Sequence, residues 1–78
     1  MGYQVFGRLS CNYCQQSKKL LDKYNLAYEF YDLQDPQFAA MYVEKFRPMV
    51  PVTHTTVPVI FYNKIFIGGF TELKNKLI

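Results

Sequence analysis

The stretch RLSCNYC, residues Arg8 to Cys14, decides how the rest of the chain is interpreted. YQVF at Tyr3 to Phe6 precedes it and predicts a short strand that ends at Gly7. An amphipathic helix follows, and Ser10 is placed to cap a helix that begins at Cys11. The apolar stripe of that predicted helix consists of Cys14, Ser17, Leu20, Leu21 and Tyr24. The two cysteines therefore lie where a strand gives way to the start of a helix.

The middle of the chain predicts a second strand and a second helix. We expect Asn25 to end the first helix in a left-handed conformation. Leu26 to Leu33 is rich in aromatic residues and predicts a strand parallel to the first, because a helical crossover joins the two. Asp35 and Pro36 suit the first turn of a helix, where Asp accepts free amide hydrogen bonds. The inward face of this helix is predicted to comprise Phe38, Met41, Tyr42 and Phe46.

The last part of the chain predicts a hairpin and a final helix. Arg47 to Thr56 contains two prolines and is expected to be irregular. Pro58 to Tyr62 and Lys64 to Ile67 are apolar runs around Asn63, a pattern typical of a β-hairpin. A short helix is predicted over Thr71 to Leu77. The alternation of strands and helices indicates an α/β fold.

Length and composition favour one domain, residues 1–78. Half of the 78 residues are apolar, enough for a single small core. The formal net charge is only +3 with no dense basic run, so we expect no nucleic-acid partner. No apolar run approaches the roughly 18 residues of a membrane span, and no basic start followed by an apolar run marks a leader. We therefore expect a cytoplasmic protein that binds no membrane.

Basic side chains gather near the cysteines in the sequence, namely Arg8, Lys18, Lys19 and Lys23. Such a group would raise the local concentration of small anions, and it would equally suit a solvated helix face. The sequence leaves both interpretations open.

The Cys11 and Cys14 pair is suited to redox chemistry. Closing so short a loop removes little entropy from the unfolded chain, so a disulfide here would stabilise the fold poorly. Residues three apart on a helix are neighbours, and free amides at a helix start favour a thiolate at Cys11. Cys14 lies one turn deeper on the inward stripe, which predicts a less ionised thiol. Cys11 is thus the expected nucleophile and Cys14 the expected resolving thiol.

A metal site is the competing interpretation of two nearby cysteines. A closed zinc site needs four ligands, and the chain offers only these cysteines and His54 as soft donors. We expect no bound metal in the single chain.

Three motifs together resemble those of the glutaredoxins, in the family's order and at suitable spacings. They are RLSCNYC, TVP at Thr56 to Pro58, and GGF at Gly68 to Phe70 with Leu73 behind it. The compact chain is similar to the small dithiol glutaredoxins of phages and large DNA viruses. The resemblance implies the thioredoxin fold, a four-stranded mixed sheet flanked by three helices in the order β-α-β-α-β-β-α.

The resemblance also implies a set of glutathione-binding residues. Pro58 would follow a cis peptide bond that turns the backbone of Val57 toward the ligand, where it can pair like an added strand. The helix start after the glycines would hold the γ-glutamyl carboxylate. The implied set is Arg8, Tyr13, Thr56, Val57, Pro58, Gly69, Phe70 and Thr71.

Four residues depart from the common family pattern. Asn12 stands where proline is usual between the cysteines, which should change the redox potential. His54 and Thr55 stand where many relatives carry a basic or amide side chain that touches the glycine end of glutathione. Glu72 replaces a common aspartate, and we assume no ligand contact for it.

The sequence thus predicts an enzyme, a glutathione-dependent thiol-disulfide oxidoreductase that uses glutathione as co-substrate. It would reduce protein disulfides and glutathione mixed disulfides as a monomer, in the host cytoplasm if the source is viral. The family resemblance implies a ribonucleotide reductase as one client. Three alternatives remain: a redoxin served by thioredoxin reductase, a dimeric carrier of a glutathione-ligated iron-sulfur cluster, and a non-catalytic adapter.

Overall fold

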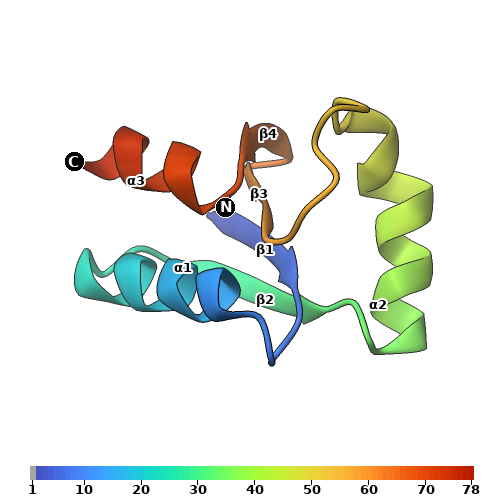
Figure 1. The fold of residues 1–78 in the computed structure, drawn as a ribbon, viewed down its shortest axis with the longest axis horizontal. Coiled ribbons are helices and arrows are strands. Elements are labelled where there is room, and N and C mark those ends of the chain that lie inside the picture. Colours follow the sequence, from blue (N-terminus) through green and yellow to red (C-terminus); the bar gives the residue numbers. More distant parts are fainter. Residues whose placement is uncertain (1) are drawn as a thin grey trace.

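A computed structural model describes residues 2–78 and shows a four-stranded mixed sheet with helices around it (Figure 1). Met1, the first residue of the predicted domain, lies outside the described residues. The regular elements are β1 (Tyr3–Gly7), α1 (Asn12–Lys23), β2 (Tyr28–Asp32), α2 (Pro36–Met41), β3 (Val59–Tyr62), β4 (Ile65–Gly68) and α3 (Phe70–Leu77). The strands lie in the order β2-β1-β3-β4, with β1 parallel to β2 and antiparallel to β3. This is the predicted thioredoxin-type topology.

Strand β1 occupies an inner position in the sheet, and its side chains alternate between two cores. Tyr3 and Val5 join a cluster that includes Leu21 of α1 and Leu73 of α3. Phe6 points the other way and packs with a second cluster that contains no residue of α1 or α3. Helices α1 and α3 therefore cover one face, and α2 with its extension covers the other (Figure 1).

The start of α1 differs from the prediction by one residue. Cys11 is the N-cap, with extended backbone angles of φ −83° and ψ 119°, and its sulfur accepts a hydrogen bond from the amide of Cys14. Ser10 therefore does not cap the helix. At the other end Asn25 adopts a left-handed φ of 56° as expected, but Tyr24 is 41% exposed and does not belong to the buried stripe.

Helix α2 begins as predicted, with the Asp35 side chain accepting a hydrogen bond from the amide of Gln37 at 2.9 Å. After Met41 the helix widens into a π-helical segment, Tyr42–Phe46, and then tightens into a 3₁₀ turn, Arg47–Met49. Part of the segment expected to be irregular is therefore helical. Phe46, at the end of the widened segment, is buried in the core on this face.

The hairpin and the last helix complete the fold. Asn63 and Lys64 form the turn between β3 and β4 with φ values of 49° and 68°, the left-handed angles that tight hairpins need. Helix α3 begins at Phe70 with Gly69 as its N-cap, so Thr71 lies inside the helix and is not its cap. Within residues 2–78, no helix is long and apolar enough to cross a membrane.

Candidate active site

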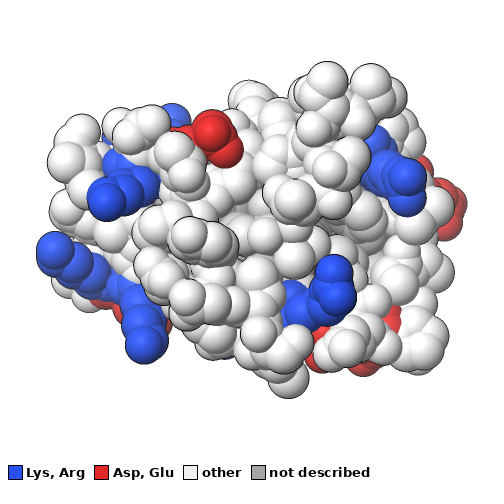
Figure 2. Space-filling view, in the orientation of Figure 1, with Lys and Arg blue, Asp and Glu red and all other residues white. Residues whose placement is uncertain are grey.

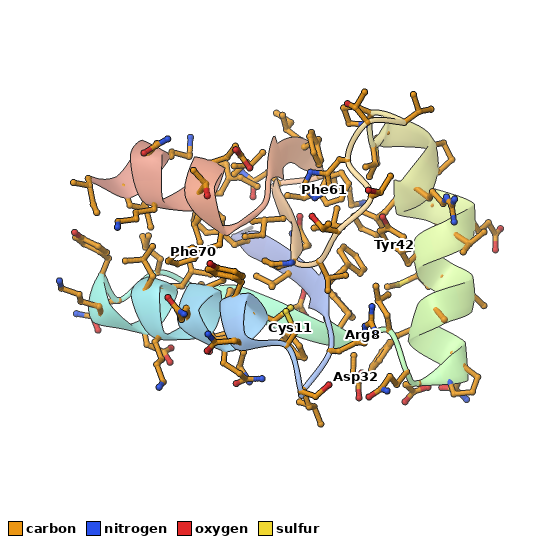
Figure 3. The ribbon with its side chains drawn as sticks, viewed as in Figure 1. Arg8, Cys11, Asp32, Tyr42, Phe61 and Phe70 are labelled. Atoms are coloured by element: carbon orange, nitrogen blue, oxygen red, sulfur yellow. The ribbon has the colours of Figure 1, made fainter. Side chains whose placement is uncertain are left out.

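Three segments meet at one end of the sheet: the start of α1, the residues just before β3 and the start of α3. Figure 3 shows Cys11 at the start of α1, after the loop that carries Arg8. The Cys11 sulfur lies 3.8 Å from the carbonyl oxygen of Val57. The peptide bond between Val57 and Pro58 is cis, as the resemblance implied.

Cys11 is the accessible sulfur of the pair. Its side chain is partly exposed, and its sulfur accepts the Cys14 amide hydrogen bond at 3.2 Å. Amide groups at a helix start point toward the cap position, where a negative charge is favoured by the helix dipole. The geometry can therefore stabilise the charge that develops on Cys11 when it attacks or leaves a disulfide.

Cys14 is fully buried, and its environment opposes ionisation. Burial, reinforced by the hydrogen bond with the Cys11 side chain, raises the pKa of the Cys14 thiol to about 12. Gly7 makes room for this sulfur, because a β-carbon at Gly7 would overlap the Cys14 Sγ. Cys14 is therefore a protonated, shielded thiol at neutral pH, as its place on the inward stripe indicated.

A cleft of about 370 Å³ opens between these segments. Its lining contains seven of the eight residues implied for glutathione binding, which come from all three segments. The lining residues are Tyr13, His54, Thr56, Val57, Pro58, Gly69, Phe70, Thr71 and Glu72. The rings of Tyr13 and Phe70 face one another across the cleft with centroids 5.7 Å apart. The structure thus brings together motifs that are about 40 residues or more from the cysteines in sequence.

Arg8 is the one predicted binding residue that does not line the cleft. It is exposed in the loop before α1, and its carbonyl oxygen accepts a hydrogen bond from the amide of Cys11 at 3.2 Å. A backbone hydrogen bond from Arg8 and its guanidinium charge both act to lower the pKa of Cys14, but burial outweighs them. In this structure Arg8 belongs to the loop that leads into the cysteine pair.

Two residues of the cleft, His54 and Glu72, were noted in the sequence as departures from the family pattern and were not included in the predicted binding set. The His54 Nε2 atom lies 3.3 Å from the carbonyl oxygen of Pro58. The Glu72 carboxylate accepts a hydrogen bond from the amide of Gly69 at 2.7 Å, which caps α3. A Glu three residues after an N-cap is a recognised helix-start signal, but a glycine cap lacks the side chain that would have made the signal visible.

The basic residues near the cysteines are partly engaged in packing. The Lys18 ammonium lies 4.6 Å from the centroid of the Phe30 ring, and the Lys23 ammonium lies 5.7 Å from that of Tyr24. In Figure 2 the Lys and Arg side chains on the visible face form several groups with uncharged surface between them. These contacts favour the solvated helix face over a dedicated anion-steering cluster. Residues 2–78 contain no group of three or more His, Cys, Asp or Glu side chains that could hold a metal ion.

Comparison with known proteins agrees with this geometry. The family model for glutaredoxin matches residues 4–67. A mitochondrial glutaredoxin-2 from Rattus norvegicus is 35% identical over 68 residues, which are 87% of this chain and 42% of that protein. The chain therefore spans about two fifths of the length of that relative.

Two solved structures show the same fold. Glutaredoxin 1 from Francisella tularensis, complexed with cacodylate, aligns with a TM-score of 0.72 and 32% identity, covering 96% of this chain and 90% of that one. A buckwheat glutaredoxin in complex with glutathione aligns with a TM-score of 0.78 and 26% identity, covering 97% and 67%. The matched segment includes both cysteines and the residues before β3, and on these grounds the chain belongs to the glutaredoxin family.

Proposed function

We propose that this chain is a glutathione-dependent thiol-disulfide oxidoreductase in which Cys11 attacks and Cys14 resolves. The observation that carries the proposal is the asymmetry of the pair: an accessible sulfur at a helix start beside a fully buried one. Thiol exchange requires a thiolate that attacks the substrate disulfide. It also requires a second thiol close enough to attack the resulting mixed disulfide and release the substrate. The CXXC segment of this chain supplies both within one helical turn.

The reaction consists of two exchanges. The Cys11 thiolate attacks one sulfur of the substrate disulfide, forms a mixed disulfide and releases the other sulfur as a thiolate. Cys14 gives up its proton and attacks the Cys11 sulfur, which forms the Cys11 to Cys14 disulfide and releases the second substrate thiol. Two molecules of glutathione then reduce this disulfide and leave as oxidised glutathione.

The cleft supports glutathione as the reductant. Backbone groups of Val57 border it beside the Cys11 sulfur, where an extended tripeptide can pair with them. The amides of Phe70 and Thr71 lie at the start of α3, a favourable place for a carboxylate. The similar buckwheat glutaredoxin is known in complex with glutathione. A ribonucleotide reductase client, a monomeric state and a cytoplasmic location stay predictions.

The proposal is tested with a small glutathione mixed disulfide and two serine variants. Cys11→Ser should abolish turnover, because the other cysteine of the chain, Cys14, is buried and cannot attack the substrate disulfide. Cys14→Ser should retain part of the activity, because free glutathione can release the mixed disulfide in place of Cys14. Equal activity in the two variants would contradict the assignment of roles.

The choice of electron donor needs a separate comparison. The disulfide form should be reduced by glutathione and not by thioredoxin reductase with NADPH. Reduction by thioredoxin reductase alone would make the chain a redoxin of the same fold. A brown colour with visible absorbance after anaerobic reconstitution would instead support the cluster carrier.

A further inference from the structure

The side chain of His54 lines the cleft beside the residues before β3 and the start of α3. We propose that His54 is a positioning residue that holds the Val57 and Pro58 backbone in place against β4 and the start of α3. This inference rests on the proposed function, since it concerns how the same cleft keeps its shape for glutathione.

Two contacts and one close approach tie His54 to the cleft. Its Nε2 atom lies 3.3 Å from the Pro58 carbonyl oxygen, which can only accept, so Nε2 must carry the proton. Its ring packs edge to face against Phe66 of β4, with centroids 5.4 Å apart. Its Cε1 atom lies 3.4 Å from the point where a β-carbon of Gly69 would be. One side chain thus contacts the cis-proline segment and β4, and it lies beside the N-cap of α3.

The segment around His54 has few other attachments. Among residues 51–56, His54 is the one residue that is partly buried, and the other five are exposed. Val52 is 93% exposed, although it is a large apolar residue. The His54 amide donates to the carbonyl of Pro51 at 2.9 Å, a contact within the loop itself. The imidazole is therefore the principal side chain that connects this loop to the rest of the fold.

His54 also lies in the wall between two cavities. Besides the cleft, a second cavity of about 380 Å³ lies between this loop, Tyr42 and Arg47. The residues that line both cavities are His54, Thr56 and Val57. A backbone with open space on both sides has little packing to fix it, so the hydrogen bond and ring contact of His54 decide where Val57 presents its amide and carbonyl.

The test separates the hydrogen bond of His54 from the packing of its ring. His54→Gln places an amide donor near the position of Nε2, whereas His54→Phe keeps an aromatic ring against Phe66 and removes the donor. Thr53→Ala is the matched control, because Thr53 is an exposed neighbour in the same loop. Each variant is assayed with a glutathione mixed disulfide, and KM and kcat are determined separately.

We expect His54→Phe to raise KM about threefold to tenfold, the effect of one hydrogen bond, and to leave kcat within about twofold. His54→Gln and Thr53→Ala should keep KM within about twofold of the parent value. An unchanged KM in His54→Phe would overturn the proposal. An equal rise in KM in the Phe and Gln variants would overturn the proposal as well, because the hydrogen bond of His54 would then make no contribution to KM.

A second readout does not depend on activity. Nitrogen-15 NMR of the imidazole should show a protonated Nε2 at neutral pH, and a neutral ring protonated only on Nδ1 would overturn the proposal. His54→Phe should shift the amide signals of Val57 and Gly69, and His54→Gln should restore them. If the parent protein did not use glutathione, the proposed function would be wrong. The amide signals of Val57 and Gly69 would still show whether His54 positions the Val57 and Pro58 backbone.

Discussion

The starts of α1 and α3 face the same cleft but are capped in different ways. Each has an N-cap residue with an extended backbone, Cys11 for α1 and Gly69 for α3. At α1 the Cys11 sulfur itself accepts the amide hydrogen bond. At α3 the glycine has no side chain, and the carboxylate of Glu72 reaches back to the cap amide.

The difference separates a reactive helix start from a binding one. The group that caps α1 is also the proposed nucleophile, so the amide that stabilises the helix also stabilises the attacking sulfur. The cap of α3 is supplied from within that helix, which leaves the amides of Phe70 and Thr71 for a ligand. A helix start can thus serve chemistry or recognition, depending on which group occupies its cap.

The largest expected effect comes from filling the space between Gly7 of β1 and the Cys14 sulfur at the start of α1. Gly7→Ala should lower the free energy of unfolding by about 1 to 3 kcal/mol, because its β-carbon would overlap the buried Cys14 sulfur. Urea denaturation measures the loss. The double variant Gly7→Ala/Cys14→Ala should recover most of the lost free energy of unfolding. If the double variant were as unstable as Gly7→Ala, overlap with the Cys14 sulfur would not be the cause of the loss.

A smaller effect is expected from the ionisation of Cys14. Its folded pKa is raised to about 12 by burial, so the stability contributed by the neutral thiol is present below about pH 9 and is lost as the pH rises toward 12. The measured quantity is the difference in the free energy of unfolding between the parent and Cys14→Ala. Between pH 7 and pH 10 this difference should change by about 1 kcal/mol, at the expense of the parent. Parallel pH profiles of the two proteins would show that Cys14 ionises normally.

The smallest expected effect is at the start of α3. Glu72→Ala should lower the free energy of unfolding by about 0.5 to 1 kcal/mol, because the Gly69 amide loses its partner. Glu72→Gln keeps an acceptor and should lose less. Neither change should impair the attack by Cys11, measured in single-turnover experiments. A strong effect of Glu72→Ala on that step would remove the distinction between the two helix starts.

The order of the elements was predicted from strong local signals in the sequence. The meeting of the three motifs was predicted only from their resemblance to those of the glutaredoxins. Short apolar and aromatic-rich runs located the strands, and the turn at Asn63 located the hairpin. The cap of α1 was placed at Ser10 because serine is the better capping residue by propensity. The backbone instead becomes helical one residue later, and tertiary contact with Val57 holds Cys11 at the boundary.

Other features of the site depend on packing that a single sequence does not reveal. The π-helical segment after α2 leads to Phe46, which packs against Phe6 and Phe61 from distant strands. His54 lines the cleft through contacts with Pro58 and Phe66 that no spacing rule encodes. Arg8 is exposed in the loop before α1 and does not line the cleft. Such placements follow from long-range contacts.

The most direct test of the account is the alkylation of two single-cysteine proteins with iodoacetamide at pH 7. At this pH the thiolate fraction of Cys14 is about a thousandfold below that of an ordinary thiol, and burial hinders the reagent further. Cys11 in the Cys14→Ser protein should therefore react at least about a hundredfold faster than Cys14 in the Cys11→Ser protein. In concentrated urea the two rates should converge. Equal rates in the folded proteins, or a faster Cys14, would contradict the division of roles between the two cysteines.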